Sequence, residues 1–179
     1  MPPIPWIEAD RLAWVGCRLV EESVKSELLA RLRLECGLVY TVDCRLVRQA
    51  EMGLLEIETS CLPQDGPRVH SLLRSVLETL STTGIQSRTL ERAKLALSGE
   101  LAQQLEDPRL AMAMLADAAR HSRPTADPLG ELQDIGLDTI AACIQRWILP
   151  NACAFSVTGP LLEDDIEKYA LDAAVLPPH

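Results

Sequence analysis

The hydrophobic pattern of the first third of the chain changes its period once, at a glycine. Up to this point apolar residues recur every three or four positions, which predicts one long amphipathic helix from Asp10 to Gly37. From Leu38 the period becomes two, and it returns after a turn around 49–53. We therefore expect an antiparallel hairpin with one face in water. The predicted inner phase of its first strand carries Tyr40, Val42, Cys44 and Leu46.

The rest of the chain is mostly helical in pattern, interrupted by proline and glycine. Helical periodicity recurs over 69–84, 87–107, 109–120 and 138–149. Alternation over Ala152–Thr158 predicts a closing strand. Helices collected on one face of a mostly antiparallel sheet make an α+β layer fold. No linker divides residues 1–179, so we expect a single domain.

Composition and charge exclude several classes of partner. The chain has 179 residues, of which 47% are apolar and 24% charged, as in a globular domain of ordinary size. A net charge of −9 and an aromatic content of 3% argue against nucleic acid as a partner. No apolar run approaches the ~18 residues of a membrane span, so no membrane partner is expected. The N-terminus shows no signal-peptide pattern, which favours a cytoplasmic location.

The residues that could carry chemistry are scattered. The six cysteines form no C-x-x-C pair and are expected to be reduced thiols, mostly buried. His70, His121 and His179 lack the spacing of a zinc site, and we expect His70 and His121 on the surface. No metal or cofactor is therefore expected on this chain. A metal-independent hydrolase that uses an unrecognised Cys or Ser is the rival enzyme hypothesis.

Five segments carry a pattern of their own in a fixed order. The longest, Ser26–Tyr40, reads S-x-L-x-x-x-L-R-x-x-x-G-L-x-Y. The others are Gly84–Lys94, Leu105–Pro108, Leu132–Ile140 and Phe155–Pro160. Together they resemble the second, non-zinc half of the pitrilysin/insulinase family of zinc metallopeptidases, which includes mitochondrial processing peptidase. The resemblance covers about residues 10–160 and leaves 161–179 as an acidic and apolar tail.

The resemblance implies a role for two residues. In this family a zinc-bearing half and a similar half without metal face each other across a chamber that holds a peptide. Arg33 and Tyr40 match an arginine and a tyrosine that contact the bound peptide near the zinc. A guanidinium and a phenol can both donate to a carbonyl that gains negative charge. The alternatives are that Arg33 solvates the helix end, that Tyr40 is a half-buried strand residue, and that Arg31 is the donor.

The resemblance also implies partners. We expect a non-catalytic subunit or half-domain, inactive alone, that completes the peptide chamber of a zinc-bearing chain with the H-x-x-E-H motif. The zinc belongs to that partner, and a homodimer can form in its absence. Three prolines make 2–9 a poor strand, so the sheet can be short of its first strand. The alternative is a degenerate peptide- or protein-binding module with no role in proteolysis.

Overall fold

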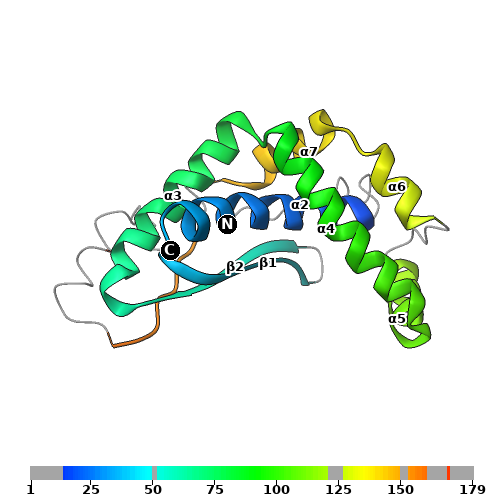
Figure 1. Ribbon diagram of the computed structural model, residues 1–179, viewed down its shortest axis with the longest axis horizontal. Coiled ribbons are helices and arrows are strands. Elements are labelled where there is room, and N and C mark those ends of the chain that lie inside the picture. The colour runs from blue at the N-terminus through cyan, green and yellow to red at the C-terminus, as the bar shows by residue number, and fades with distance from the viewer. Residues whose placement is uncertain (1–13, 50–51, 121–126, 150–152, 161–168, 170–179) are drawn as a thin grey trace.

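The computed structural model describes residues 14–49, 52–120, 127–149, 153–160 and 169 (Figure 1). The first helix, α2 (Trp14–Leu28), continues without a break into the π-helical turn η1 (Leu29–Glu35) and leads to the hairpin strands β1 (Val39–Gln49) and β2 (Met52–Cys61). The later elements are η2 (Pro63–Asp65), α3 (Gly66–Thr83), α4 (Ser87–Glu106), α5 (Pro108–Arg120), α6 (Pro128–Asp134) and α7 (Leu137–Trp147).

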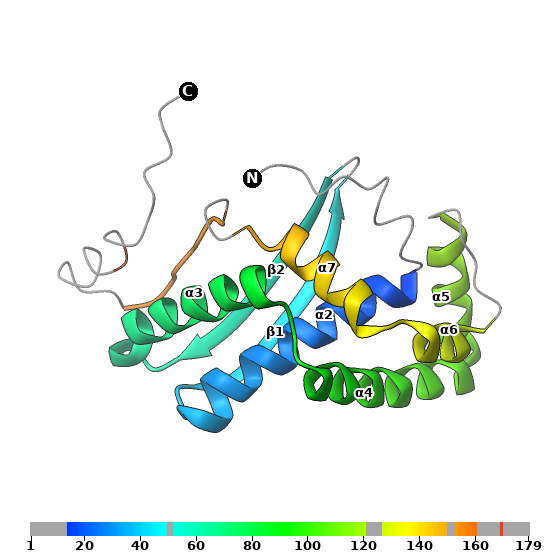
Figure 2. The ribbon, with the colours of Figure 1, turned by 90° about the horizontal axis from the view of Figure 1, so that it is seen from above.

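The fold is a helical layer on one face of a two-stranded antiparallel sheet, which confirms the predicted α+β class. Helix α2 packs against β1 on one side and against α4 on another, and α3 packs against α7. Figure 1 shows the hairpin below α2, and none of the described helices covers its lower face. Figure 2 shows the hairpin crossing α2 at an angle. The sheet therefore has one covered and one open face.

The core follows the predicted apolar stripes. Helix α2 buries Val20, Val24 and Leu28 on one side, as a three-to-four period dictates. Strand β1 supplies Val42 and Cys44 from its inner face. The fully or almost fully buried side chains of the later helices are Leu80, Ala93, Leu97, Leu101, Leu132, Ile140 and Ile144. The predicted helix over 10–37 is confirmed from Trp14 onward, and positions 10–13 lie outside the described residues, as does any strand in 2–9.

The closing strand predicted over Ala152–Thr158 is wrong for its described part. Residues 153–158 form no strand, and position 152 lies outside the described residues. A strand needs a neighbour to complete its hydrogen bonds, and the described sheet contains only β1 and β2. Instead the segment runs beside α3 (Figure 2). The Phe155 ring meets the ring of His70 edge-on at a centroid distance of 4.6 Å.

His70 is not the surface histidine that its sequence context predicts. Its side chain is buried on α3, between the rings of Phe155 and Tyr169. The expectation failed because the covering residues come from the far end of the chain, which no local pattern announces. His121 lies outside the described residues. The cysteine prediction is corrected in part: all six are free thiols, but only Cys17 and Cys44 are buried.

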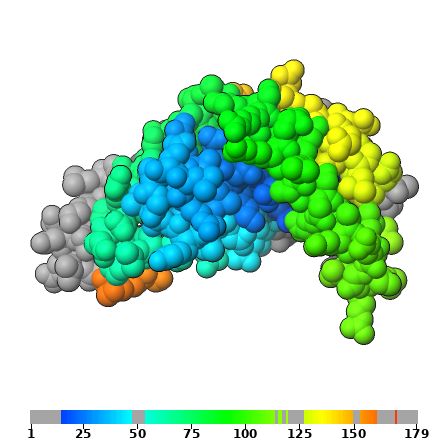
Figure 3. All heavy atoms as spheres, viewed as in Figure 1, coloured from blue at the N-terminus to red at the C-terminus, as the bar shows by residue number. Residues whose placement is uncertain are grey.

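The helices α5 and α6 need separate description. The short helix α6 was not predicted; it begins where Asp127 accepts a hydrogen bond from the Gly130 amide at 2.9 Å. Helix α5 leaves the body as an arm at the end of α4 (Figure 3) and exposes Leu110, Met112 and Leu115. None of the described helices combines the length and apolar character needed to cross a bilayer.

Candidate active-site corner

The candidate site is the corner where the first helix turns into the hairpin. The helix widens into a π-turn over its last seven residues, a form often found at functional sites. Gly37 then adopts a φ of 64°, which favours glycine because it has no Cβ. The Gly37 amide donates to the Arg33 carbonyl at 3.0 Å, and the Leu38 amide donates to the Leu32 carbonyl at 2.9 Å. These bonds fix the short path from Arg33 to β1.

A β-bulge decides the direction of Tyr40. Val39 lies opposite Cys61 and Val42 lies opposite Thr59, so three steps along β1 match two steps along β2. The extra residue lets both Val39 and Val42 point inward, where they are buried. Tyr40 is thereby turned outward and is 73% exposed. The predicted inner phase was therefore wrong at Tyr40, and this side chain is not a half-buried strand residue.

The two arginines at the helix end, Arg31 and Arg33, differ in whether they form ion pairs within the chain. Arg31 forms ion pairs with Glu27 at 3.9 Å and with Glu35 at 3.0 Å, at helical spacings in each direction. Arg33 is exposed and forms no ion pair or side-chain hydrogen bond with the other described residues. Next to it, Leu34 is 74% exposed although it is apolar. Arg33 is therefore the better placed of the two to bind something outside the chain.

A hollow of about 280 Å³ lies on the α3 side of the same helix. Its walls combine apolar side chains of α3 with hydroxyl groups and the Arg31–Glu27 ion pair. Thr89 donates to the Glu27 carboxylate at 2.9 Å and ties this wall to α4. The lining residues are Glu27, Arg31, Leu72, Ser75, Val76, Thr79, Leu80, Thr83, Gly84, Ile85 and Gln86. Neither Arg33 nor Tyr40 belongs to this hollow.

The open face of the hairpin is polar and mainly acidic. Among the described side chains it presents, besides Tyr40, the carboxylates of Asp43, Glu56 and Glu58 and one arginine, Arg45. The Arg45 guanidinium pairs with Glu56 at 3.0 Å and with Glu58 at 3.1 Å. Arg45 is shared by two of these carboxylates, and the third, Asp43, lies 3.9 Å from Lys25 of α2, so Glu56 and Glu58 carry more charge than Arg45 balances. A ligand that lies on this face would meet a phenol at one end and carboxylates along its length.

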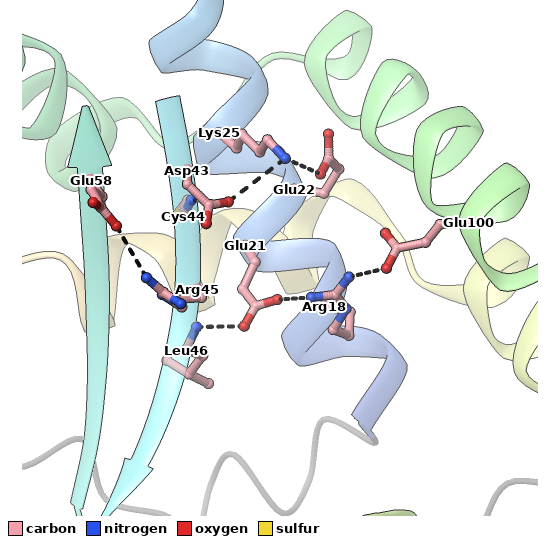
Figure 4. Close-up of polar contacts among 10 residues, drawn as sticks. All are labelled: Arg18, Glu21, Glu22, Lys25, Asp43, Cys44, Arg45, Leu46, Glu58 and Glu100. Carbon is pink, nitrogen blue, oxygen red and sulfur yellow. Dashed lines mark hydrogen bonds and ion pairs between the residues drawn. The ribbon is translucent and has the colours of Figure 1, made fainter. Parts of the chain in front are cut away.

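Behind this face, a charged cluster joins α2, β1 and α4 (Figure 4). Arg18 pairs with Glu21 at 2.8 Å and with Glu100 at 2.6 Å. The other carboxylate oxygen of Glu21, which is buried, accepts a hydrogen bond from the Leu46 amide in β1. Burial raises the pKa of Glu21 above its ordinary value, against the opposing effects of the Leu46 amide and Arg18. No sequence motif announced this cluster, because its members meet only through the packing of three elements.

The described residues offer no metal centre. They contain no group of three or more His, Cys, Asp or Glu side chains positioned to hold an ion. The donors at the corner are a guanidinium and a phenol, which are poor metal ligands and good hydrogen-bond donors. Their chemistry fits the recognition of a carbonyl or carboxylate oxygen.

Comparisons with known proteins give this geometry a context. No family model matches the chain. Over 141 residues, the chain is 28% identical to uncharacterized zinc proteases of Mycobacterium bovis and Mycobacterium tuberculosis. This match spans 76% of the chain and 32% of each relative, so the chain covers about a third of their length.

Solved structures give the same fold. A peptidase M16 inactive domain from Pseudomonas fluorescens matches with a TM-score of 0.67 at 15% identity, over 79% of this chain and 36% of that one. The chain thus shares the fold of this inactive domain, in agreement with the resemblance of its sequence to a pitrilysin/insulinase half-domain, and is called the half-domain for that reason. The periplasmic protease PqqL from Escherichia coli contains the same fold, with a TM-score of 0.59 over 80% of this half-domain at 14% identity. The half-domain has one helical face and one open sheet face, and its corner carries the exposed Arg33 and Tyr40.

Proposed function

We propose that the half-domain is the non-catalytic part of a two-part zinc peptidase and that it completes the peptide chamber of a zinc-bearing partner. The open face of the sheet would form one wall of the chamber, and the helices would form its outside. The curated relatives named zinc proteases are about three times as long as the region they share with this chain, which supports a larger functional unit. A peptide would lie between the two parts.

Within this chamber, Arg33 and Tyr40 would donate to the peptide. The guanidinium carries five N–H donors and the phenol carries one O–H donor. Donors that are held in place before the reaction stabilise a carbonyl oxygen as it becomes negative. A zinc ion on the partner would supply Lewis-acid activation of that carbonyl or of a water molecule. This chain's residues would orient the peptide and share the developing charge.

The observation that carries the proposal is the direction of Tyr40. A strand without the bulge would turn the phenol into the core, where Val42 and Cys44 lie. The bulge instead places Tyr40 on the open face, next to a helix end whose Arg33 makes no ion pair with the other described residues. Two donors that the fold leaves exposed at one corner are arranged for a ligand rather than for stability.

The test compares three variants of the chain in complex with its zinc-bearing partner. Tyr40→Phe keeps the ring and removes the donor, so turnover should fall by about 10²–10³ while assembly and stability are retained. Arg33→Ala should also lower turnover and raise KM. Arg31→Ala is the matched control, because Arg31 is already paired with Glu27 and Glu35, and its turnover should stay close to that of the parent chain.

The alternative function is a peptide- or protein-binding module with no role in proteolysis. It predicts that Tyr40→Phe and Arg33→Ala leave the turnover of any co-purifying peptidase unchanged, or that no H-x-x-E-H chain co-purifies at all. The three-variant comparison therefore separates the two functions. If Tyr40 were only structural, Tyr40→Phe would lower the unfolding free energy by about 1 kcal/mol and leave turnover normal.

A further inference from the structure

The two edges of the hairpin differ in whether another strand can pair with them. On the β1 edge, main-chain donors are already satisfied by carboxylates. The Leu46 amide donates to Glu21 from α2, and the Cys44 amide donates to Asp43 at 3.1 Å (Figure 4). Lys25 of α2 also reaches over to Asp43, at 3.9 Å. A strand that approached this edge would have to displace a buried glutamate.

The register shows where the donors of β2 point. Opposite residues in an antiparallel pair alternate between exchanging both hydrogen bonds and exchanging none. Because the Leu46 amide turns to Glu21, the pair Leu46–Leu55 exchanges none. The main-chain groups of Leu55, Ile57 and Thr59 therefore point away from β1. Within the described part of the chain, no strand pairs with this edge of β2. An exposed edge of this kind can accept an added strand.

The side chains along β2 indicate what that strand would carry. On the open face, Glu56 and Glu58 alternate along the edge strand, and Glu58 is 72% exposed. On the inner face, Leu55 and Ile57 pack against the core but remain only half-buried. A strand beside β2 would thus meet carboxylates on one face and uncovered apolar surface on the other. The complementary sequence alternates basic and apolar residues.

We propose that the outer edge of β2 binds an extended peptide with alternating Lys or Arg and apolar side chains, as a third strand of the sheet. A second copy of the chain fits this edge poorly, because its glutamates would face those of the first copy. That this peptide is the substrate rests on the proposed function. The binding itself requires no partner chain.

The test uses the isolated full-length chain and three blocked octapeptides. One alternates Lys and Val, one alternates Glu and Val, and one alternates Lys and Pro, which keeps the charge but cannot form a ladder. The Lys–Val peptide should bind at least about tenfold more tightly than the others, and binding should weaken with salt. In NMR spectra it should shift the amides of Leu55, Ile57 and Thr59 more than those of Cys44 and Leu46.

Two matched pairs of variants complete the test. Glu58→Gln should weaken binding of the Lys–Val peptide about two- to fivefold, while Glu78→Gln on the exposed side of α3 should not. Ile57→Pro removes an outward donor and should abolish the ladder, while Ile57→Val, which keeps this donor and an apolar side chain, should leave affinity close to that of the parent chain. Equal binding of the Lys–Pro peptide, or amide shifts scattered away from β2, would overturn the proposal. Because no zinc subunit is present, these results are independent of the turnover test.

Discussion

At the level of single residues, Glu21 helps to connect three elements, α2, β1 and α4. It accepts from a strand amide with one carboxylate oxygen and from Arg18 with the other, and Arg18 continues to Glu100 on α4. Its ionised form is disfavoured by burial and favoured by these two donors, and burial dominates, so its pKa is raised. Glu21 therefore holds β1 against α2 and occupies a main-chain donor at the β1 edge. When it is charged, its burial costs some stability.

Glu21 makes the stability of the chain depend on pH. Because its folded-state pKa lies above its ordinary value, its contribution to stability is largest below the ordinary pKa and falls as the pH rises through the folded pKa. Glu21→Gln keeps an acceptor for Leu46 and removes the titration. Urea unfolding from about pH 5 to about pH 8 should show the parent chain losing stability relative to this variant.

A second substitution at the same position tests the hydrogen bonds rather than the charge. Glu21→Ala leaves the Leu46 amide and one side of Arg18 without their acceptor, which should lower the unfolding free energy by about 1–3 kcal/mol at every pH. An alanine variant as stable as the glutamine variant would show that the edge of β1 does not need the carboxylate.

At the scale of elements, helices and the hairpin were predictable, and the exceptions share one cause. The helical stripes of α2, α3 and α4 and the change of period at Gly37 are local properties, readable from spacing alone. The bulge at Tyr40 depends on register with β2, and the fate of 153–158 depends on whether a neighbouring strand accepts it. Both are properties of pairs of elements, which a single stretch of sequence does not encode.

The candidate site divides in the same way. The pair Arg33 and Tyr40 could be named from the sequence, because the motif that carries the resemblance contains both. Their exposure, and the engagement of Arg31 with two glutamates, required the structure. The acidic row of Glu56 and Glu58 follows from the alternation along the strand, whereas the open edge of β2 could not be named, since it follows from the direction of each amide rather than from residue type.

Two glycine-to-alanine substitutions, one at the corner between helix and strand and one inside a helix, should change the unfolding free energy in opposite directions. Gly37→Ala forces a Cβ into a left-handed conformation and should lower the unfolding free energy by about 1–2 kcal/mol, although nothing lies within 4 Å of the new atom. Gly99→Ala, inside α4 and equally unobstructed, should raise it by about 0.5–1 kcal/mol. Denaturant unfolding of both variants measures the pair; equal effects would remove the conformational explanation.

At the scale of the whole molecule, the half-domain has an open sheet face and an apolar arm. Leu110, Met112 and Leu115 on α5 are exposed, and short helices draw most of their stability from packing. We expect the isolated chain to self-associate at high concentration, and Met112→Glu to reduce this association without unfolding the core. Light scattering on both proteins measures the effect; a clean monomer at every concentration would contradict it.

Metal content distinguishes the half-domain from an independent zinc enzyme. The described residues hold no cluster of potential ligands, and a catalytic zinc needs three protein ligands and an open position. The isolated chain should therefore retain far less than one zinc per molecule after dialysis. Stoichiometric zinc that is lost on replacing His70 or His121 would contradict the assignment of the metal to a partner.

Peptide hydrolysis by the zinc-bearing chain, measured with and without this half-domain, shows most directly whether the two chains form one chamber. If the half-domain completes the chamber, neither chain alone should cleave the peptide at an appreciable rate. Activity should rise as the half-domain is added and level off at one half-domain per zinc-bearing chain, and Tyr40→Phe should titrate to the same ratio with lower turnover. A zinc-bearing chain that is fully active alone, and unaffected by the half-domain at any ratio, would show that the half-domain does not complete the chamber.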